Sequence, residues 1–193
     1  MGQMRVRQIF RWGFVALVAL TAILQAHLAY IRYSGNFHAV IAGEVYRSAQ
    51  VTPEDLAIYQ RDYGIRSVLN LRGATPGHPW YDDEIASAKA LGLVHEDFAM
   101  SASRVLTVEE STELIALMRS MPKPLLVHCR RGADRTGLAM ALYLAGISGA
   151  DESTAAGQLS IWFGHFSVPY LSSTYPMDES WQLMVPVLGL DKG

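Results

Sequence analysis

The sequence predicts an α/β domain with a central, mostly parallel sheet flanked by helices, preceded by one transmembrane helix at the N-terminus. Three observations support this prediction. From residue 39 onward, short apolar runs alternate with helical segments of about a dozen residues, as in helix-covered parallel sheets. The most apolar part of the chain is gathered near its start, in a run without charges. The length of 193 residues favours one domain after that run.

The apolar run, Gly13–Ile31, holds no Asp, Glu, Lys or Arg. At about 1.5 Å per helical residue it nearly spans a hydrocarbon core of about 30 Å. A cleaved signal peptide shares this pattern, but the small residues that cleavage requires fit poorly here, which favours an uncleaved anchor. More arginines precede the run than follow it, which places the N-terminus in the cytoplasm and the rest of the chain across the membrane. These arginines are Arg5, Arg7 and Arg11 before the run and Arg32 after it.

Composition excludes several classes of function. The formal charge of −2, with no basic stripe beyond the N-terminus, argues against a nucleic-acid partner. The single cysteine forms no intramolecular disulfide, and no Cys/His cluster indicates a metal. A solitary cysteine also suits an oxidising compartment, where it has no partner within the chain.

The elements of the domain follow from local signals. Residues 39–50 predict a hairpin that turns near Gly43. A helix begins after Thr52 as N-cap, with Pro53 at its first position, and ends at Gly64. A strand covers residues 65–72, a Gly- and Pro-rich loop residues 73–79, a helix residues 80–92 and a strand residues 93–100.

The second half continues the alternation. Thr107 and Glu110 form a capping box at the start of a helix over residues 107–121. Residues 124–128 predict a short apolar strand, followed at once by a loop and a helix. The aromatic-rich segment Ser160–Pro176 is expected to be core or a lip beside the site.

The only cysteine lies one residue beyond the strand that ends at His128. Ligands of parallel sheets bind beyond the carboxyl ends of the strands, and a following helix N-terminus directs N–H groups and its dipole at an anion. Gly132 and Gly137 let the loop curl closely, and Arg135 offers a planar fork for two phosphate oxygens. A thiol in this field ionises more readily than a free cysteine and becomes a nucleophile. The alternative, that Cys129 is an inert buried thiol, does not account for this spacing.

The stretch HCRRGADRTG resembles the HCxxGxxR[ST] phosphate loop of the cysteine-dependent protein tyrosine and dual-specificity phosphatases. The upstream segments EVYRSAQ, YGIRSVLNLRG and DFAMSA resemble those of compact bacterial dual-specificity-like members. The resemblance covers roughly Gly43–Phe166 and does not extend to the apolar run or to roughly the final 25 residues. Together with the apolar run, it predicts a membrane-anchored enzyme of the bacterial type. The expected organisation is residues 1–11 in the cytoplasm, 12–31 as anchor, 32–42 as linker and 43–193 as a periplasmic phosphatase domain. Enzymes of rhodanese-type sulfur transfer also carry a cysteine in a loop. Their loop does not require Gly132 or the Arg135–Thr136 pair, so this sequence favours the phosphatase.

The resemblance implies that the Cys129 thiolate attacks phosphorus and forms a phosphocysteine, without a metal or another cofactor. Arg135 and the loop N–H groups would hold the phosphoryl oxygens. Thr136 would hydrogen-bond the sulfur and His128 would fix the loop. The other residues expected to bind substrate are Arg130, Arg131, Gly132, Ala133, Gly137 and Arg72.

Three alternatives remain for the general acid: Asp97, Asp134 or neither of them. Asp97 lies 32 residues before Cys129, close to the usual family spacing. Aligning the family pattern with FAMSA instead places Ala102 where an aspartate is expected. Asp134, inside the loop, is used in some branches, and the third alternative is that neither aspartate serves.

Several cations bear on the substrate. Arg130 and Arg131 are expected at the pocket rim, where they favour a strongly anionic substrate. Arg72 and Arg47 are further candidates for substrate contact. The membrane helix and the rim arginines favour a lipid or glycolipid phosphate. The alternatives are a phosphoprotein substrate and a catalytically weak phosphate-binding module.

Overall fold

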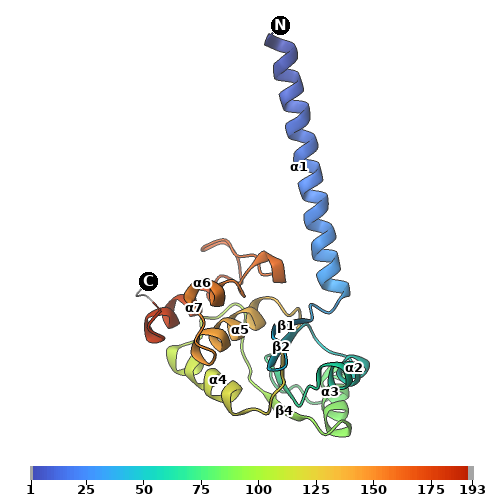
Figure 1. Cartoon of the computed structure of the whole chain (residues 1–193), viewed down its shortest axis with the longest axis vertical. Helices are drawn as coiled ribbons and strands as arrows, with labels where there is room; N and C mark the ends of the chain where they lie inside the picture. Colours follow the sequence, from blue (N-terminus) through green and yellow to red (C-terminus); the bar gives the residue numbers. More distant parts are fainter. Residues whose placement is uncertain (1, 191–193) are drawn as a thin grey trace. The chain divides into compact units, whose positions relative to one another are not determined.

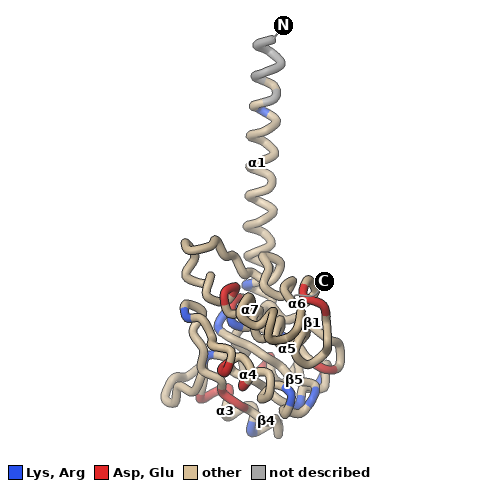
Figure 2. Tube along the Cα trace, turned by 90° about the vertical axis from the view of Figure 1, so that its left-hand side faces the viewer, with Lys and Arg blue, Asp and Glu red and all other residues tan. Residues whose placement is uncertain are grey.

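The computed structural model describes residues 2–190, and the chain divides into two compact units, residues 1–34 and 35–193. The first unit is the helix α1 (Gly2–Tyr33). Its stretch Phe10–Tyr33 has a mean hydropathy of 2.0 and is long and apolar enough to cross a membrane, as a signal sequence near the N-terminus also is. Charged residues are sparse along it (Figure 2). The predicted apolar helix is confirmed, whereas its role as anchor or signal and the limits of anchor, linker and phosphatase domain remain predictions.

The second unit is built on a five-stranded sheet of order β1-β2-β5-β3-β4 (Figure 1). Its strands are β1 (His38–Ile41), β2 (Val45–Ser48), β3 (Ser67–Asn70), β4 (Val94–Asp97) and β5 (Leu125–His128). Only β1 and β2 pair antiparallel, as the predicted hairpin. The pairs β2–β5, β5–β3 and β3–β4 are parallel, which confirms the predicted fold class.

Helices cover the sheet on both faces, so the unit has three layers (Figure 1). One face carries α2 (Pro53–Tyr63) and α3 (Pro79–Ala90). The other carries α4 (Val108–Ser120), α5 (Asp134–Gly146), the short α6 (Glu152–Ala156) and α7 (Pro176–Val187). A single 3-10 turn, η1 (Ile161–Phe163), lies between α6 and α7.

The alternation of side chains along β5 determines which face of the sheet His128 and Cys129 point to. Leu125 and Val127 belong to the core under α4, α5 and α7, whereas Leu126 belongs to the core under α2 and α3. Because successive strand residues point to opposite faces, His128 faces the α2–α3 side. Cys129, the next residue, joins the core on the α5 side.

Local signals set the helix ends where the sequence predicted them. Thr52 caps α2 reciprocally with Asp55, and Gly64 ends this helix in the left-handed region at φ 68°. Thr107 and Glu110 form the predicted capping box of α4. The strands β3 and β4 are shorter than predicted, because the residues that follow them leave the ladder and turn toward the loop after β5.

Candidate active site

The loop after β5 occupies the predicted position at the carboxyl end of the sheet. Residues 129–133 connect β5 to α5, which begins at Asp134. The parallel neighbours β2 and β3 run on either side of β5, with Ser48 and Asn70 both opposite His128. Cys129 is a free cysteine with 3% of its surface exposed.

Two glycines are required by close approach of the backbone. Gly132 has a φ of +65°, and a Cβ there would lie 2.6 Å from the carbonyl carbon and oxygen of Ser48. At Gly137, a Cβ would lie 2.8 Å from the Gln158 carbonyl oxygen. The loop therefore packs directly on β2, and the first turn of α5 packs directly on the segment after α6.

Arg47 on β2 supports the loop from beneath. Its guanidinium is fully buried, donates from Nη2 to the Gly132 carbonyl at 2.8 Å and from Nη1 to Gln158 Oε1 at 2.7 Å. It also stacks on Phe163, 4.0 Å from the ring centroid. Burial lowers the pKa of Arg47 to about 9, while the nearby negative charge of Cys129 opposes that shift. The interpretation of Arg47 as a substrate contact is wrong, because no ligand reaches a side chain buried in this way.

Asn36 adds a second support. Its Nδ2 donates to the carbonyl oxygens of Arg131 and Gly132, both at 3.1 Å, and of Phe163 at 2.9 Å. With these carbonyls turned toward Asn36 and Arg47, the loop is free to direct its N–H groups to the opposite side, as an anion-binding loop requires.

Arg135 is held across the mouth of the loop. Its Nη1 donates to the carbonyl oxygens of Leu71 and Met100, both at 3.2 Å, in the segments that follow β3 and β4. No described residue accepts a hydrogen bond from its Nη2 or Nε, so these nitrogens retain donors for a ligand. Arg135, the second residue of α5, is thus fixed by the segments around Leu71 and Met100, which lie 64 and 35 residues away in sequence.

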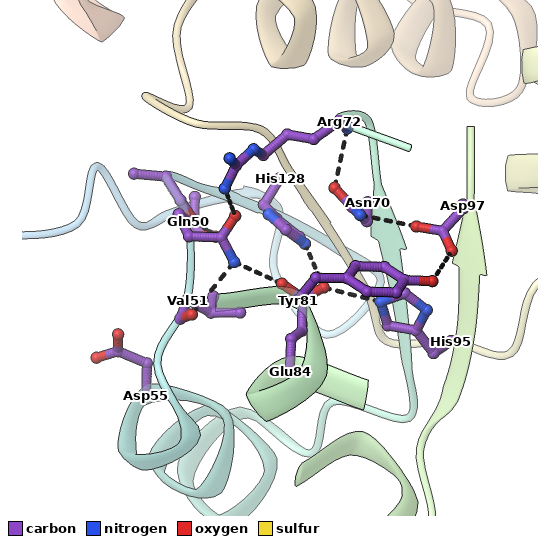
Figure 3. Close-up of polar contacts among 12 residues, drawn as sticks. Gln50, Val51, Asp55, Asn70, Arg72, Tyr81, Glu84, His95, Asp97 and His128 are labelled. Atoms are coloured by element: carbon purple, nitrogen blue, oxygen red, sulfur yellow. Dashed lines mark hydrogen bonds and ion pairs between the residues drawn. The ribbon is translucent and has the colours of Figure 1, made fainter. Parts of the chain in front are cut away.

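His128 is fixed by a carboxylate that sequence reasoning missed. Glu84 on α3 accepts hydrogen bonds at Oε1 from Nε2 of both His128 and His95, each at 2.8 Å (Figure 3). Burial acts to raise the pKa of Glu84, but the bonds from the two histidines and from Gln50 hold it at about 2. The available signal was the spacing of Tyr81, Glu84 and Ala88, the buried face of α3.

The same network reaches Arg72. Gln50 donates from Nε2 to Glu84 and accepts from Arg72 Nη1, each at 2.5 Å (Figure 3). The Arg72 guanidinium also stacks on Trp80, 3.3 Å from the ring centroid. Burial and the charges of Arg135 and Arg130 lower the pKa of Arg72, against the charges of Glu84 and Cys129. Arg72 therefore lies in the electrostatic field of the loop.

The remaining residues that were predicted to bind substrate lie within the loop itself. Arg130 and Arg131 are exposed, and Ala133 is buried at the start of α5. The aromatic segment that was expected as core or lip is largely exposed: Trp162, Phe166 and Tyr170 are 64%, 65% and 87% exposed. Within this segment, Phe163 packs against the Arg47 guanidinium, and His165 is 3% exposed.

Asp97, at the end of β4, is held by two donors. Asn70 Nδ2 donates to its Oδ1 at 2.7 Å, and the Tyr81 hydroxyl donates to its Oδ2 at 2.6 Å (Figure 3). The bond to Asp97 raises the pKa of Tyr81 to about 12. Ala102 lies in a turn of the following loop and brings no acid there.

Asp134 has a partner that the sequence did not reveal. Its Oδ1 lies 2.8 Å from Nδ1 of His165, and Nε2 of the same ring lies 3.1 Å from Oδ2 of Asp178. Thr136, two residues further along α5, is fully buried, and no described residue hydrogen-bonds its Oγ1. Within residues 2–190, no group of three or more His, Cys, Asp or Glu side chains is arranged to hold a metal ion.

Comparison with known proteins shows the family of this chain. Residues 31–156 match the family model described as "Tyrosine phosphatase family". The chain belongs to this family of cysteine-dependent tyrosine and dual-specificity phosphatases and is a phosphoric monoester hydrolase. No curated protein matches the sequence significantly.

Solved structures share the fold at low identity. TpbA of P. aeruginosa, as a Cys-to-Ser variant in complex with pTyr, is 21% identical with a TM-score of 0.59, over 83% of this chain and 93% of that one. PTPMT1 is 14% identical with a TM-score of 0.58, over 79% and 98%. The core catalytic domain of the PP-IP phosphatase SIW14 from S. cerevisiae is 19% identical with a TM-score of 0.57, over 80% and 93%.

Proposed function

We propose that this phosphatase cleaves its substrate through a phosphocysteine formed on Cys129. The observation that carries the proposal is the placement of Cys129 at the carboxyl end of the central strand. It lies in a loop backed by the buried cation Arg47 and spanned by Arg135. Such a site is suited to bind a phosphate dianion.

In the first step, the Cys129 thiolate attacks phosphorus while the bond to the leaving oxygen breaks. Arg135 and the loop N–H groups stabilise the charge on the equatorial oxygens. In the second step, water attacks phosphorus and the P–S bond breaks, which releases inorganic phosphate. Thr136 would donate to the departing sulfur and stabilise its negative charge, a role that the family resemblance implies; in this structure no described residue hydrogen-bonds its Oγ1.

Asp134 is the general acid in this proposal. It is the residue before Arg135 and begins the helix that follows the loop, so it belongs to the phosphate site itself. Asp97 is less suited, because Asn70 and Tyr81 engage both of its oxygens. His128 acts on Cys129 only through the shape of the loop, which Glu84 holds.

A lipid or glycolipid phosphate is the proposed substrate class. The apolar helix would tether the enzyme at a membrane, with its N-terminus in the cytoplasm and the phosphatase domain in the periplasm. Arg72, Arg130 and Arg131 gather positive charge at the loop and favour a strongly anionic headgroup. A structure of PTPMT1 in complex with PI(5)P shows that the fold accepts such a headgroup in that protein.

A phosphoprotein is the second candidate substrate, favoured by the phosphotyrosine bound to TpbA. A weak phosphate-binding module is disfavoured, because Cys129 is present in the loop after β5 and Arg135 in the first turn of α5.

The experiment compares full-length enzyme with its Cys129→Ser variant in detergent micelles. Phosphate release is measured from an aryl phosphate, phosphotyrosine peptides and phospholipids. We expect the variant to lose turnover and to keep binding, because the anion site consists of backbone N–H groups and Arg135. Appreciable turnover by Cys129→Ser would remove the mechanism. Release from peptides alone would replace the lipid assignment with the phosphoprotein one.

Topology has its own test. A reporter fused after Gly193 should be active only outside the cytoplasm, and the product should remain in the membrane fraction. A soluble exported product would show that the apolar helix is a cleaved signal peptide.

A further inference from the structure

One feature outside the proposed mechanism is a histidine enclosed by two carboxylates beside the loop after β5. His165 follows η1 and is 3% exposed. Each of its ring nitrogens faces a carboxylate oxygen, Asp134 Oδ1 from α5 and Asp178 Oδ2 from α7. The carboxylates themselves reach solvent, with side chains 21% and 32% exposed.

This geometry stores a proton. An ionised carboxylate only accepts hydrogen bonds, so two carboxylates facing the two ring nitrogens favour the imidazolium, in which both nitrogens donate. Burial acts to lower the pKa of His165, but the hydrogen bond to Asp134 and the charge of Asp178 outweigh it and raise the pKa. Among the described residues, no Lys or Arg forms an ion pair with any of the three side chains.

A general acid at neutral pH needs such a store. An aspartic acid in water loses its proton at a pH of about 4, far below the pH at which a general acid works best. We propose that His165 supplies the proton that Asp134 passes to the leaving oxygen, and that it takes a proton back in the second step. This inference rests on the proposed role of Asp134 as the acid, and it makes His165 a residue that acts through Asp134.

The proton balance closes over both steps. As the P–O bond breaks, the Asp134 carboxylate takes a proton from His165 Nδ1 and passes a proton to the leaving oxygen, which leaves a neutral imidazole, an ionised Asp134 and a phosphocysteine. Water then adds its oxygen to phosphorus as the P–S bond breaks. The proton that this water releases passes through Asp134 to His165. The products are an alcohol, hydrogen phosphate, a thiolate and the original imidazolium.

The test compares two leaving groups in His165→Gln, measured with the full-length protein in micelles. Glutamine keeps an N–H donor for Asp134 but carries no titratable proton. An aryl phosphate with a good leaving group needs little protonation, whereas an alkyl phosphate needs a great deal. We expect kcat/KM to fall by about 10²–10⁴-fold for the alkyl phosphate and only slightly for the aryl phosphate. The basic limb of the pH profile with the alkyl substrate should move to lower pH.

The aryl reaction is the internal control for folding and for the nucleophile. An equal loss on both substrates, or an unchanged basic limb, would overturn the role of His165. Asp134→Asn separates the role of Asp134 as general acid from the role of His165 as its proton source. If Asp134→Asn discriminates by leaving group and His165→Gln does not, the acid assignment stands and this inference falls. If neither discriminates, both fall, while loss of turnover in Cys129→Ser would still support the nucleophile.

Asp178→Asn tests the same inference with the ring in place. Removing one of the two charges should move the basic limb toward lower pH in the alkyl reaction. Asp151→Asn is the matched control, because Asp151 caps the short α6 and asparagine caps equally well. A basic limb that stays in place in Asp178→Asn would overturn the proposal even if His165→Gln does not fold.

Discussion

Two clusters of histidine and carboxylate flank the phosphate loop on different faces of the sheet, and they are arranged in opposite ways. In one, the carboxylate of Glu84 lies between His128 and His95, and these side chains are 0%, 0% and 9% exposed. In the other, His165 lies between Asp134 and Asp178, whose side chains reach solvent. The first cluster offers no path for a proton and is suited to hold the loop. The second joins a buried proton to an exposed acid and is suited to move it.

The largest expected effect is on stability, in Glu84→Ala. Removing the Glu84 carboxylate leaves Gln50, His95 and His128 without their acceptor, and each buried unsatisfied group typically costs about 1–3 kcal/mol. Denaturant unfolding should show this loss, and kcat/KM should fall equally for aryl and alkyl phosphates. Glu113→Ala, on the exposed face of α4, is the control and should change stability by less than about 0.5 kcal/mol. A fall in kcat/KM confined to the alkyl phosphate would contradict the prediction that the Glu84 cluster holds the loop and moves no proton.

The two clusters should respond to pH with opposite sign. The pKa of Glu84 falls from 4.5 to about 2 on folding, so its stabilisation is present above pH 4.5 and lost as pH falls toward 2. This shift corresponds to about 3 kcal/mol. The pKa of His165 is raised above 6.5, so its smaller stabilisation is present below 6.5 and lost as pH rises through the folded value. The free energy of unfolding should be measured across pH for both variants. In Glu84→Gln, its decrease as pH falls from 4.5 toward 2 should disappear. In His165→Gln, its decrease as pH rises above 6.5 should disappear.

Asp97→Asn should have a smaller effect. The amide keeps the size of the side chain but weakens the charge-assisted bonds from Tyr81 and Asn70, which corresponds to a loss of about 1–2 kcal/mol in stability. Activity should not depend on the leaving group. A selective loss on alkyl phosphates would instead identify Asp97 as the acid.

The smallest expected effect is that of Thr136→Val, in the first turn of α5. Valine matches the shape of threonine but cannot donate to the sulfur of Cys129. Loss of one hydrogen bond of about 1 kcal/mol should slow breakdown of the phosphocysteine about 5-fold. Rapid-quench measurements should show more trapped phosphoenzyme than in the wild type. An unchanged rate of breakdown would show that the buried hydroxyl does not act on the sulfur.

The parts of the site that the sequence predicted are close together in the chain. Cys129, Gly132 and Arg135 share one strand–loop–helix segment, where spacing alone determines which groups face an anion. The caps at Thr52 and Thr107 were equally local. The parts that were missed join distant segments: Glu84 lies 44 residues from His128, and His165 lies 31 residues from Asp134.

By itself, the sequence determined the α/β order of elements, the apolar N-terminal helix and the strand–loop–helix segment that carries the proposed nucleophile and arginine. These features depend on periodicity, caps and fixed spacing within about ten residues. Only the tertiary structure decided that Arg47 is buried beneath the loop, that Asp97 is bound on both oxygens and that Asp134 has His165 as partner. The physical reason is that these roles depend on burial and on contacts between distant segments. Both are set by how the helices and loops pack around the sheet.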